Sequence, residues 1–248
     1  TNFDFIFQLD GKNHSYISSI FLKSNKKVCI KYIKNKKLIN KSMSVSRPNF
    51  LINKFFDENE ISNEDYNLNE NQKYHYLNLY LNLLKKLNIK IYAKNHYLPF
   101  KNPINHSVFN ESYYLFHIDK RWEYFETKIK HNLKEKILLL AQNNKIVITS
   151  DVSRNKIFDF LKNELNNTPN IQIIDSPDLH KLLSLVFYSK ICVSSHSGLI
   201  VHSGAAFKKN IIDIVSPDIN NELDRWVPFN INYKRFDINN FIEKDFLF

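Results

Sequence analysis

Small residues gather in one segment of the chain, SSHSGLIVHSGAA at residues 194–206, which holds two of the three glycines. Small side chains at the start of a helix let a backbone approach an anion, and the free N–H groups of the first turn attract that anion. Ser197, followed by Gly198, is placed to cap such a helix or to donate to a phosphate. The segment therefore indicates an anion site, with a tightly packed helix capped by serine as the alternative.

Two histidines, His196 and His202, flank this helix start. They lie six residues apart, which does not place them on one helical face, and no carboxylate accompanies them. Zinc sites need closer spacing and more ligands, so we expect no metal here. Both histidines are instead counted among the residues around the anion.

Two adjacent cations, Lys120 and Arg121, follow the apolar run of residues 113–117. Such a pair can clamp a diphosphate, and the arginine can do so through two parallel hydrogen bonds. The alternative is a surface turn anchored by Trp122.

Ser150 and Ser216 directly follow two more apolar runs, residues 145–149 and 211–215. In an open parallel sheet, ligands bind at the carboxyl ends of the strands. We therefore expect both serines at the same crevice as the cations. Ser153, in the loop after Ser150, either points there or caps the next helix.

Regular alternation of apolar strands and helices must position these residues. Strands are predicted over 113–117, 145–149, 171–174, 191–194 and 210–215, and helices over 124–143, 154–165, 179–188 and 198–207. This order is typical of a doubly wound α/β sheet, so residues 113–248 are predicted to form a Rossmann-like domain.

The first part of the chain reads as a smaller, incomplete α/β domain over residues 1–95. Strand, helix and strand are predicted over 3–9, 15–22 and 27–33, and a helix over 71–87. Residues 96–112 contain two prolines and no periodicity, which is typical of a linker.

The formal net charge of +10 indicates an anionic partner. The densest lysine cluster, residues 23–41, is interleaved with apolar residues at strand spacing, so we do not expect nucleic acid as the partner. An anionic substrate, or peripheral contact with an anionic membrane, explains the charge as well. No apolar stretch is long enough to span a bilayer. We expect a cytoplasmic protein, with the inner face of the membrane as the place of any peripheral contact.

Cysteine usage and missing motifs exclude several classes of protein. Cys29 and Cys192 lie in apolar runs without metal spacing and are expected to be buried and reduced. The sequence has no GxSxG, P-loop or GxGxxG motif, so hydrolases, ATPases and dinucleotide oxidoreductases lose their usual support.

Three stretches carry a family resemblance: FDFIFQLDGKNHSYISSIFLKSNKKVCIKY, FHIDKRWEYFETKI and YSKICVSSHSGLIVHSGAAFKKNIIDIVSPD. In order and spacing they resemble an acceptor-domain segment, the opening of the donor domain and the DSGPxHLAAALGxPxxxLFGPT block of glycosyltransferase family 9. That family contains the ADP-heptose:lipopolysaccharide heptosyltransferases. His196 stands where the family has Asp, Leu199 replaces Pro, and one extra residue separates Gly198 from His202.

The resemblance implies a GT-B fold of two Rossmann-like domains. It also implies inverting, metal-independent transfer of a sugar from a nucleotide diphosphate donor to a glycan or glycolipid of the cell envelope, with no cofactor. Lys120 would contact the donor phosphates, Ser197 and Gly198 would receive the diphosphate, and His202 would lie nearby. The predicted donor-binding residues are Lys120, Arg121, Ser150, His196, Ser197, Gly198, His202 and Ser216.

The catalytic base of the family lies in an N-terminal loop, and the sequence offers no counterpart before Phe3. We therefore expect the chain to be a fragment of a longer enzyme. Two alternatives stay open: a GT-B-type sugar-nucleotide epimerase and a non-catalytic nucleotide-binding fragment.

Overall fold

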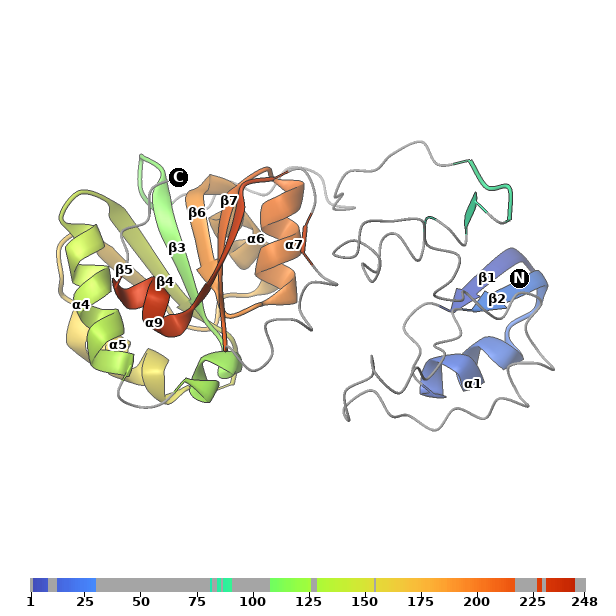
Figure 1. Ribbon diagram of the computed structural model, residues 1–248, viewed down its shortest axis with the longest axis horizontal. Helices are drawn as coiled ribbons and strands as arrows, with labels where there is room; N and C mark the ends of the chain where they lie inside the picture. Colours follow the sequence, from blue (N-terminus) through green and yellow to red (C-terminus); the bar gives the residue numbers. More distant parts are fainter. Residues whose placement is uncertain are drawn as a thin grey trace. The chain divides into compact units, whose positions relative to one another are not determined.

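The computed structural model describes residues 2–8, 13–29, 81, 84–85, 87–90, 108–125, 129–153, 155–216, 227–228 and 231–243. The chain divides into two compact units (Figure 1). The N-terminal unit comprises Thr1–Tyr92 with Asp224–Trp226, and the C-terminal unit comprises Ala93–Leu223 with Val227–Phe248.

The N-terminal unit contains a βαβ element: β1 (Phe3–Gln8), α1 (Asn13–Phe21) and β2 (Ser24–Cys29). The two strands pair in parallel, with Phe5 opposite Lys26, which confirms the predicted pattern. Pairing begins earlier on β2 than predicted, because the N–H of Phe3 already donates to the carbonyl of Lys23 at 3.0 Å. The predicted residues 30–33, and most of the helix predicted over 71–87, fall outside the described residues.

The C-terminal unit is built on a six-stranded, wholly parallel sheet in the order β5-β4-β3-β6-β7-β8. Its strands are β3 (Tyr113–Ile118), β4 (Lys145–Ser150), β5 (Ile171–Ile174), β6 (Ser189–Ser194), β7 (Asn210–Val215) and β8 (Tyr233–Asp237). Its helices are the 3-10 helix η3 (Lys120–Tyr124) and the α-helices α4 (Ile129–Ala141), α5 (Lys156–Leu165), α6 (Leu179–Tyr188), α7 (Gly198–Ala206) and α9 (Ile238–Glu243). The predicted doubly wound α/β sheet is therefore confirmed.

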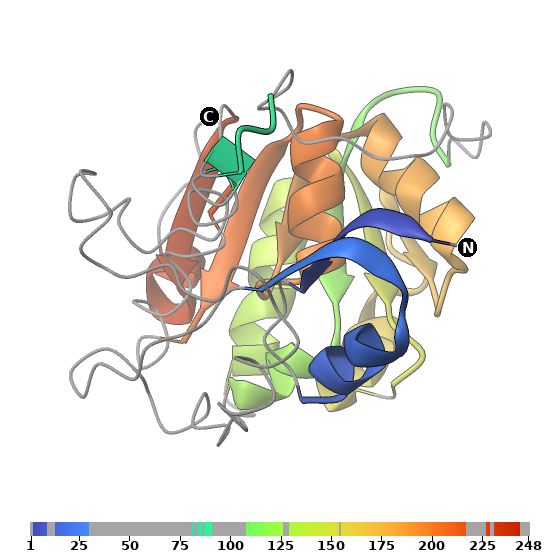
Figure 2. The same ribbon diagram turned by 90° about the vertical axis from the view of Figure 1, so that its right-hand side faces the viewer.

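Helices cover both faces of this sheet, as apolar strands without alternation require. Helices α4, α5 and α9 lie on one face, and α6 and α7 lie side by side on the other (Figures 1 and 2). Successive residues of β3 point to opposite faces, so Phe116 packs with the first group of helices and Leu115 with the second.

Two parts of the C-terminal unit differ from the prediction. The helix expected over 124–143 is preceded by η3 and begins at Ile129, because Phe125 is extended and its N–H closes a tight turn onto the carbonyl of Trp122 at 3.1 Å. Strand β8 was not expected, since YKRFD is polar. Among the described strands β8 pairs with β7 alone, so as an edge strand it needs no continuous apolar run.

Gly204 lets α7 approach the sheet closely. A Cβ atom on Gly204 would lie 3.0 Å from Cδ1 of Ile211 and 3.9 Å from Sγ of Cys192. Cys192 is fully buried, as predicted, and burial raises the pKa of its thiol to about 11. Among the described residues, no helix is both long and apolar enough to cross a bilayer.

Candidate functional site

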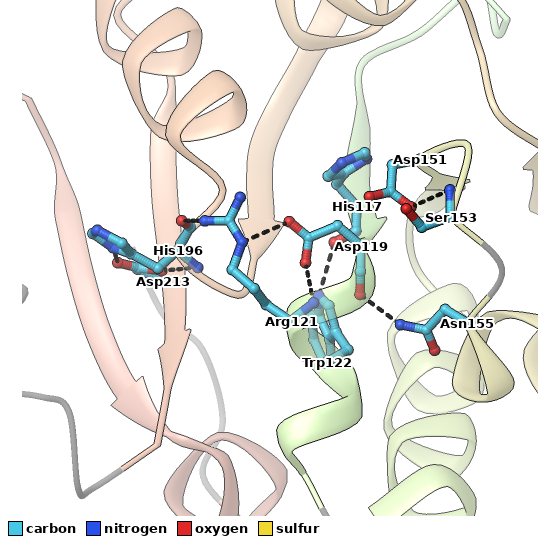
Figure 3. Close-up of polar contacts among 9 residues, drawn as sticks. All are labelled: His117, Asp119, Arg121, Trp122, Asp151, Ser153, Asn155, His196 and Asp213. Atoms are coloured by element: carbon cyan, nitrogen blue, oxygen red, sulfur yellow. Dashed lines mark hydrogen bonds and ion pairs between the residues drawn. The ribbon is translucent and has the colours of Figure 1, made fainter. Parts of the chain in front are cut away.

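The strand order predicts a ligand crevice at the carboxyl ends of β3 and β6. From β3 the chain proceeds outward to β4 and β5, then returns to β6 on the opposite side of β3. In open parallel sheets this reversal leaves the loops after the two central strands diverging, and ligands bind between them. Arg121 follows β3 and His196 follows β6, and here they meet: Nη1 of Arg121 donates to the carbonyl of His196 (Figure 3).

A buried carboxylate fixes this arginine. Oδ2 of Asp119 lies 3.2 Å from Nε of Arg121, and Oδ1 accepts from the Arg121 backbone N–H at 3.0 Å. Asp119 is only 3% exposed, and this burial raises the pKa of its carboxyl to about 6 even though the neighbouring guanidinium opposes the shift. The predicted cation pair is thus split: Arg121 is held by the protein, and Lys120 beside it is exposed.

The side of His196 away from Arg121 is held by Asp213 of β7. Asp213 is fully buried and accepts from the His196 backbone N–H and from its Nδ1, both at 2.6 Å. The hydroxyl of Tyr233 also donates to Asp213, at 2.5 Å. The backbone and the ring of His196 are therefore both engaged by the protein.

Polar residues form a continuous row across the sheet, near the carboxyl ends of its strands. Strand register aligns Thr149, His117, Ser194, Asp213 and Arg235 on neighbouring strands. The row lies on the face covered by α6 and α7, because the residues two positions earlier pack in the apolar clusters of that face. This row of polar side chains therefore lies on the sheet face from which α7 begins.

The first turn of α7 begins without a side-chain cap. Ser197 occupies the N-cap position as predicted, but its hydroxyl makes no capping hydrogen bond, and the first turn contains no acidic residue. A Cβ atom on Gly198 would meet nothing within 4 Å. Backbone N–H groups at a helix start that lack a capping side chain attract anions. The arrangement can therefore receive a phosphate at Ser197 and Gly198.

The remaining predicted site residues are Ser150, His202 and Ser216. The Ser150 hydroxyl donates to Asp175 at 2.9 Å and accepts from the Ser176 N–H at 3.0 Å, so it joins the ends of β4 and β5. His202 lies half-buried on α7, and Ser216 lies half-buried directly after β7.

Asn155, and not Ser153, caps α5. Its side-chain oxygen accepts from the N–H of Ile157 at 2.8 Å, while its amide donates to the carbonyl of Asp119 at 2.5 Å (Figure 3). The backbone N–H of Ser153 donates instead to the carboxylate of Asp151. The alternative that Ser153 caps the helix is therefore wrong.

Sequence reasoning missed the partners that hold the site, namely Asp213 and Asn155, and left Asp119 and His117 without a role. A signal was present for two of them. Asp213 and His117 each interrupt an otherwise apolar strand, and a polar side chain at an inward position of such a strand needs a buried partner.

His117 makes folding sensitive to acid. Burial lowers the pKa of its imidazole from 6.5 to about 4, and its Nδ1 lies 3.0 Å from the hydroxyl of Thr149. The unfolded chain binds this proton first, so the contribution of neutral His117 is complete above pH 6.5 and is lost as the pH falls toward 4. We expect the stability advantage of the wild type over His117→Asn to shrink by up to about 3 kcal/mol between pH 7 and pH 4, measured by urea unfolding.

Thr149→Val is the matched control for that measurement. It removes the hydrogen-bond partner and keeps the imidazole, so it should lower stability at pH 7 and retain the loss on acidification. An acid dependence that is identical in the wild type and His117→Asn would show that His117 does not titrate in this range.

The described residues contain no group of three or more His, Cys, Asp or Glu side chains that could hold a metal ion.

No protein-family model matches the sequence, and the comparison with curated proteins gives no match. Solved structures do match. The chain is similar to E. coli heptosyltransferase WaaC with ADP, with 16% identity over 96% of this chain and 68% of that chain and a TM-score of 0.65. It is similar to a family 9 glycosyltransferase from Veillonella parvula, with 11% identity over 94% of this chain and 62% of that chain and a TM-score of 0.65.

A third similar structure is E. coli ADP-heptose lipopolysaccharide heptosyltransferase II, with 11% identity over 94% of this chain and 68% of that chain and a TM-score of 0.56. The chain thus spans 62% to 68% of the length of these three proteins. At these identities the likeness shows the fold. The resemblance noted in the sequence is confirmed at that level, as an α/β fold of the heptosyltransferase type.

Proposed function

We propose that this chain is the donor-binding part of a glycosyltransferase that moves a sugar from a nucleotide diphosphate to a glycan or glycolipid acceptor. The observation that carries the proposal is the open first turn of α7, which lies at the reversal of the strand order beside the cationic end of β3. A diphosphate is the part of such a donor that needs unpaired N–H groups and a cation.

The proposed chemistry is inverting and needs no metal ion. An acceptor hydroxyl attacks the anomeric carbon while a base removes its proton, and the bond to the diphosphate breaks. Negative charge grows on the departing diphosphate. The N–H groups of Gly198 and its neighbours, with the exposed ammonium of Lys120, stabilise that charge more in the transition state than in the bound donor. The catalytic base is assigned to no described residue.

The other predicted residues are proposed to lie at different distances from the phosphates. Ser197 contributes its N–H group and a hydroxyl that is not used in capping. His202 and Ser216 are proposed to line the crevice farther from the phosphates. Ser150 is proposed to support the edge of the sheet, because Asp175 already engages its hydroxyl.

The structural neighbours agree with a nucleotide sugar as the donor. WaaC of E. coli, which is similar in fold, is described with ADP and with ADP-2-deoxy-2-fluoro heptose. A nucleoside diphosphate sugar is therefore the donor class to test first, with an envelope glycolipid as the acceptor class.

Lys120→Ala is expected to weaken the binding of nucleoside diphosphates and their sugars about tenfold, since one charge-assisted contact to the phosphates is lost. Isothermal calorimetry with ADP, UDP, GDP, CMP and their sugar forms measures this loss and identifies the nucleobase that the site prefers. Lys190→Ala is the matched control, because Lys190 is exposed near the amino end of β6, at the opposite edge of the sheet.

Each outcome of the calorimetry has a meaning. Equal affinities of the wild type and Lys120→Ala would remove Lys120 from the donor site. If no nucleotide binds, the donor-binding proposal fails. Conversion of a nucleotide sugar in the absence of any acceptor would indicate an epimerase in place of a transferase.

A further inference from the structure

His196 is held in an unusual backbone conformation by side chains from two directions. Its φ is 47°, in the left-handed region that residues other than glycine rarely adopt. Asp213 accepts from its N–H at 2.6 Å, and Arg121 donates to its carbonyl (Figure 3). Conformations of this kind persist only where surrounding contacts impose them. The two contacts therefore keep the chain in the left-handed turn.

Both anchoring side chains are fixed in their own right. Asp213 is fully buried and also accepts from the Tyr233 hydroxyl at 2.5 Å and from the His196 ring at 2.6 Å. Arg121 is tied to Asp119 by its Nε at 3.2 Å and by its backbone N–H at 3.0 Å. These contacts of Asp213 and Arg121 with His196 form a clamp that connects the ends of β3 and β6 with β7.

His196 immediately precedes the turn that is proposed to receive the anion. Ser197 and Gly198 follow His196, so the torsions of His196 set the direction in which their N–H groups point. Hydrogen bonds weaken steeply as the angle at the hydrogen departs from linear. An anion site made of backbone N–H groups consequently depends on the left-handed turn before it.

We propose that Arg121 and Asp213 are positioning residues, which act through His196 to hold the first turn of α7 in the geometry that receives the donor diphosphate. The inference rests on the proposed function. It assigns Arg121 a different task from a direct phosphate ligand, because two of its side-chain nitrogens are already engaged by Asp119 and by the carbonyl of His196. Lys120 then provides the positive charge for the phosphates, and Arg121 holds the backbone turn before α7.

The test combines binding with the amide signals of the ligand-free protein. Asp213→Asn, Arg121→Lys and Arg121→Gln are compared with the wild type by calorimetry with inorganic pyrophosphate, ADP and UDP, and by ¹⁵N NMR of Gly198 and Leu199. Asp159→Asn is the matched control for Asp213→Asn, since Asp159 is exposed on α5 over the other face of the sheet.

We expect Asp213→Asn and Arg121→Lys each to weaken all three ligands about tenfold, because the geometry of shared N–H groups is lost. Arg121→Lys should be as weak as Arg121→Gln, since a lysine keeps the charge but cannot bridge Asp119 and the His196 carbonyl. In the ligand-free Asp213 and Arg121 variants, the amide NMR signals of Gly198 and Leu199 should shift. Asp159→Asn should leave these signals unchanged.

Wild-type affinity in Arg121→Lys, with a loss in Arg121→Gln, would make Arg121 a phosphate ligand and overturn its positioning role. Unchanged amide signals and affinities in Asp213→Asn would overturn the role of Asp213. If the wild type binds none of the three ligands, the proposed function fails, and the ligand-free signals alone decide the positioning claim. If Asp213→Asn does not fold, the Arg121 variants decide it, because that side chain is 45% exposed.

Discussion

Trp122→Ala is expected to lower the free energy of unfolding of the C-terminal unit by about 3 to 5 kcal/mol, the usual cost of truncating a fully buried aromatic side chain. Trp122 is completely buried, packs edge-on against Phe125 with ring centroids 5.7 Å apart, and donates from Nε1 to the carbonyl of His117 at 2.9 Å. It is the residue that fastens η3 to the end of β3. Urea unfolding followed by circular dichroism measures the loss.

Trp122→Phe separates the volume of the side chain from its hydrogen bond. It keeps most of the aromatic contact and loses the N–H donor, so we expect a loss of about 1 to 2 kcal/mol. Because η3 carries Lys120 and Arg121, Trp122→Ala should also weaken nucleotide binding under conditions where the variant is still folded. Wild-type stability of Trp122→Ala would contradict the packing described for η3.

Asn155→Ala is expected to cost about 2 to 4 kcal/mol, since one side chain serves two elements. Its oxygen accepts from the N–H groups of Ile157 and Phe158 at the start of α5, and its amide donates to the buried turn at Asp119. The substitution leaves these backbone groups without partners in a region that water does not reach. Thermal and urea unfolding of the variant measure the loss.

Asn155→Ser is the informative control for this site. Serine keeps an N-cap acceptor and is too short to reach the carbonyl of Asp119, so its stability should lie between those of the wild type and Asn155→Ala. If Asn155→Ser were as stable as the wild type, the link from α5 to the end of β3 would contribute nothing measurable.

Most of the Rossmann-like sheet could be predicted from the sequence because its strands are short apolar runs separated by turn residues. Strand β7 and helix α6 have the bounds that periodicity predicts. Helix α7 begins at Gly198 as expected. Strand β8 could not be predicted in this way, because an edge strand with a polar sequence gives no hydrophobic signal.

The place of the site in the fold could be predicted from the sequence, but the hydrogen bonds among its residues could not. Rules for parallel sheets place the residues after β3 and β6 at one crevice, which brings Arg121 to His196. The capture of His196 by Asp213 depends on a left-handed turn and on the register between β6 and β7, and one sequence shows neither. Arg121 is an example. Its charge in the sequence indicates a phosphate ligand, whereas its contacts in the structure with Asp119 and His196 indicate a positioning role.

The strand order also bears on how the C-terminal unit folds. The central strands β3 and β6 are far apart along the chain, with Tyr113 paired to Ser189, whereas β4 and β5 pair Ile146 with Ile171. Closing the longer loop costs more entropy, so β3, β4 and β5 are expected to assemble first, both in refolding and during synthesis. Until β6 docks, the inner edge of β3 is unpaired and prone to wrong partners. A nascent chain at that stage has three of the six described strands of this sheet and lacks the proposed donor site between β3 and β6, so nucleotide binding is expected only after β6 has docked.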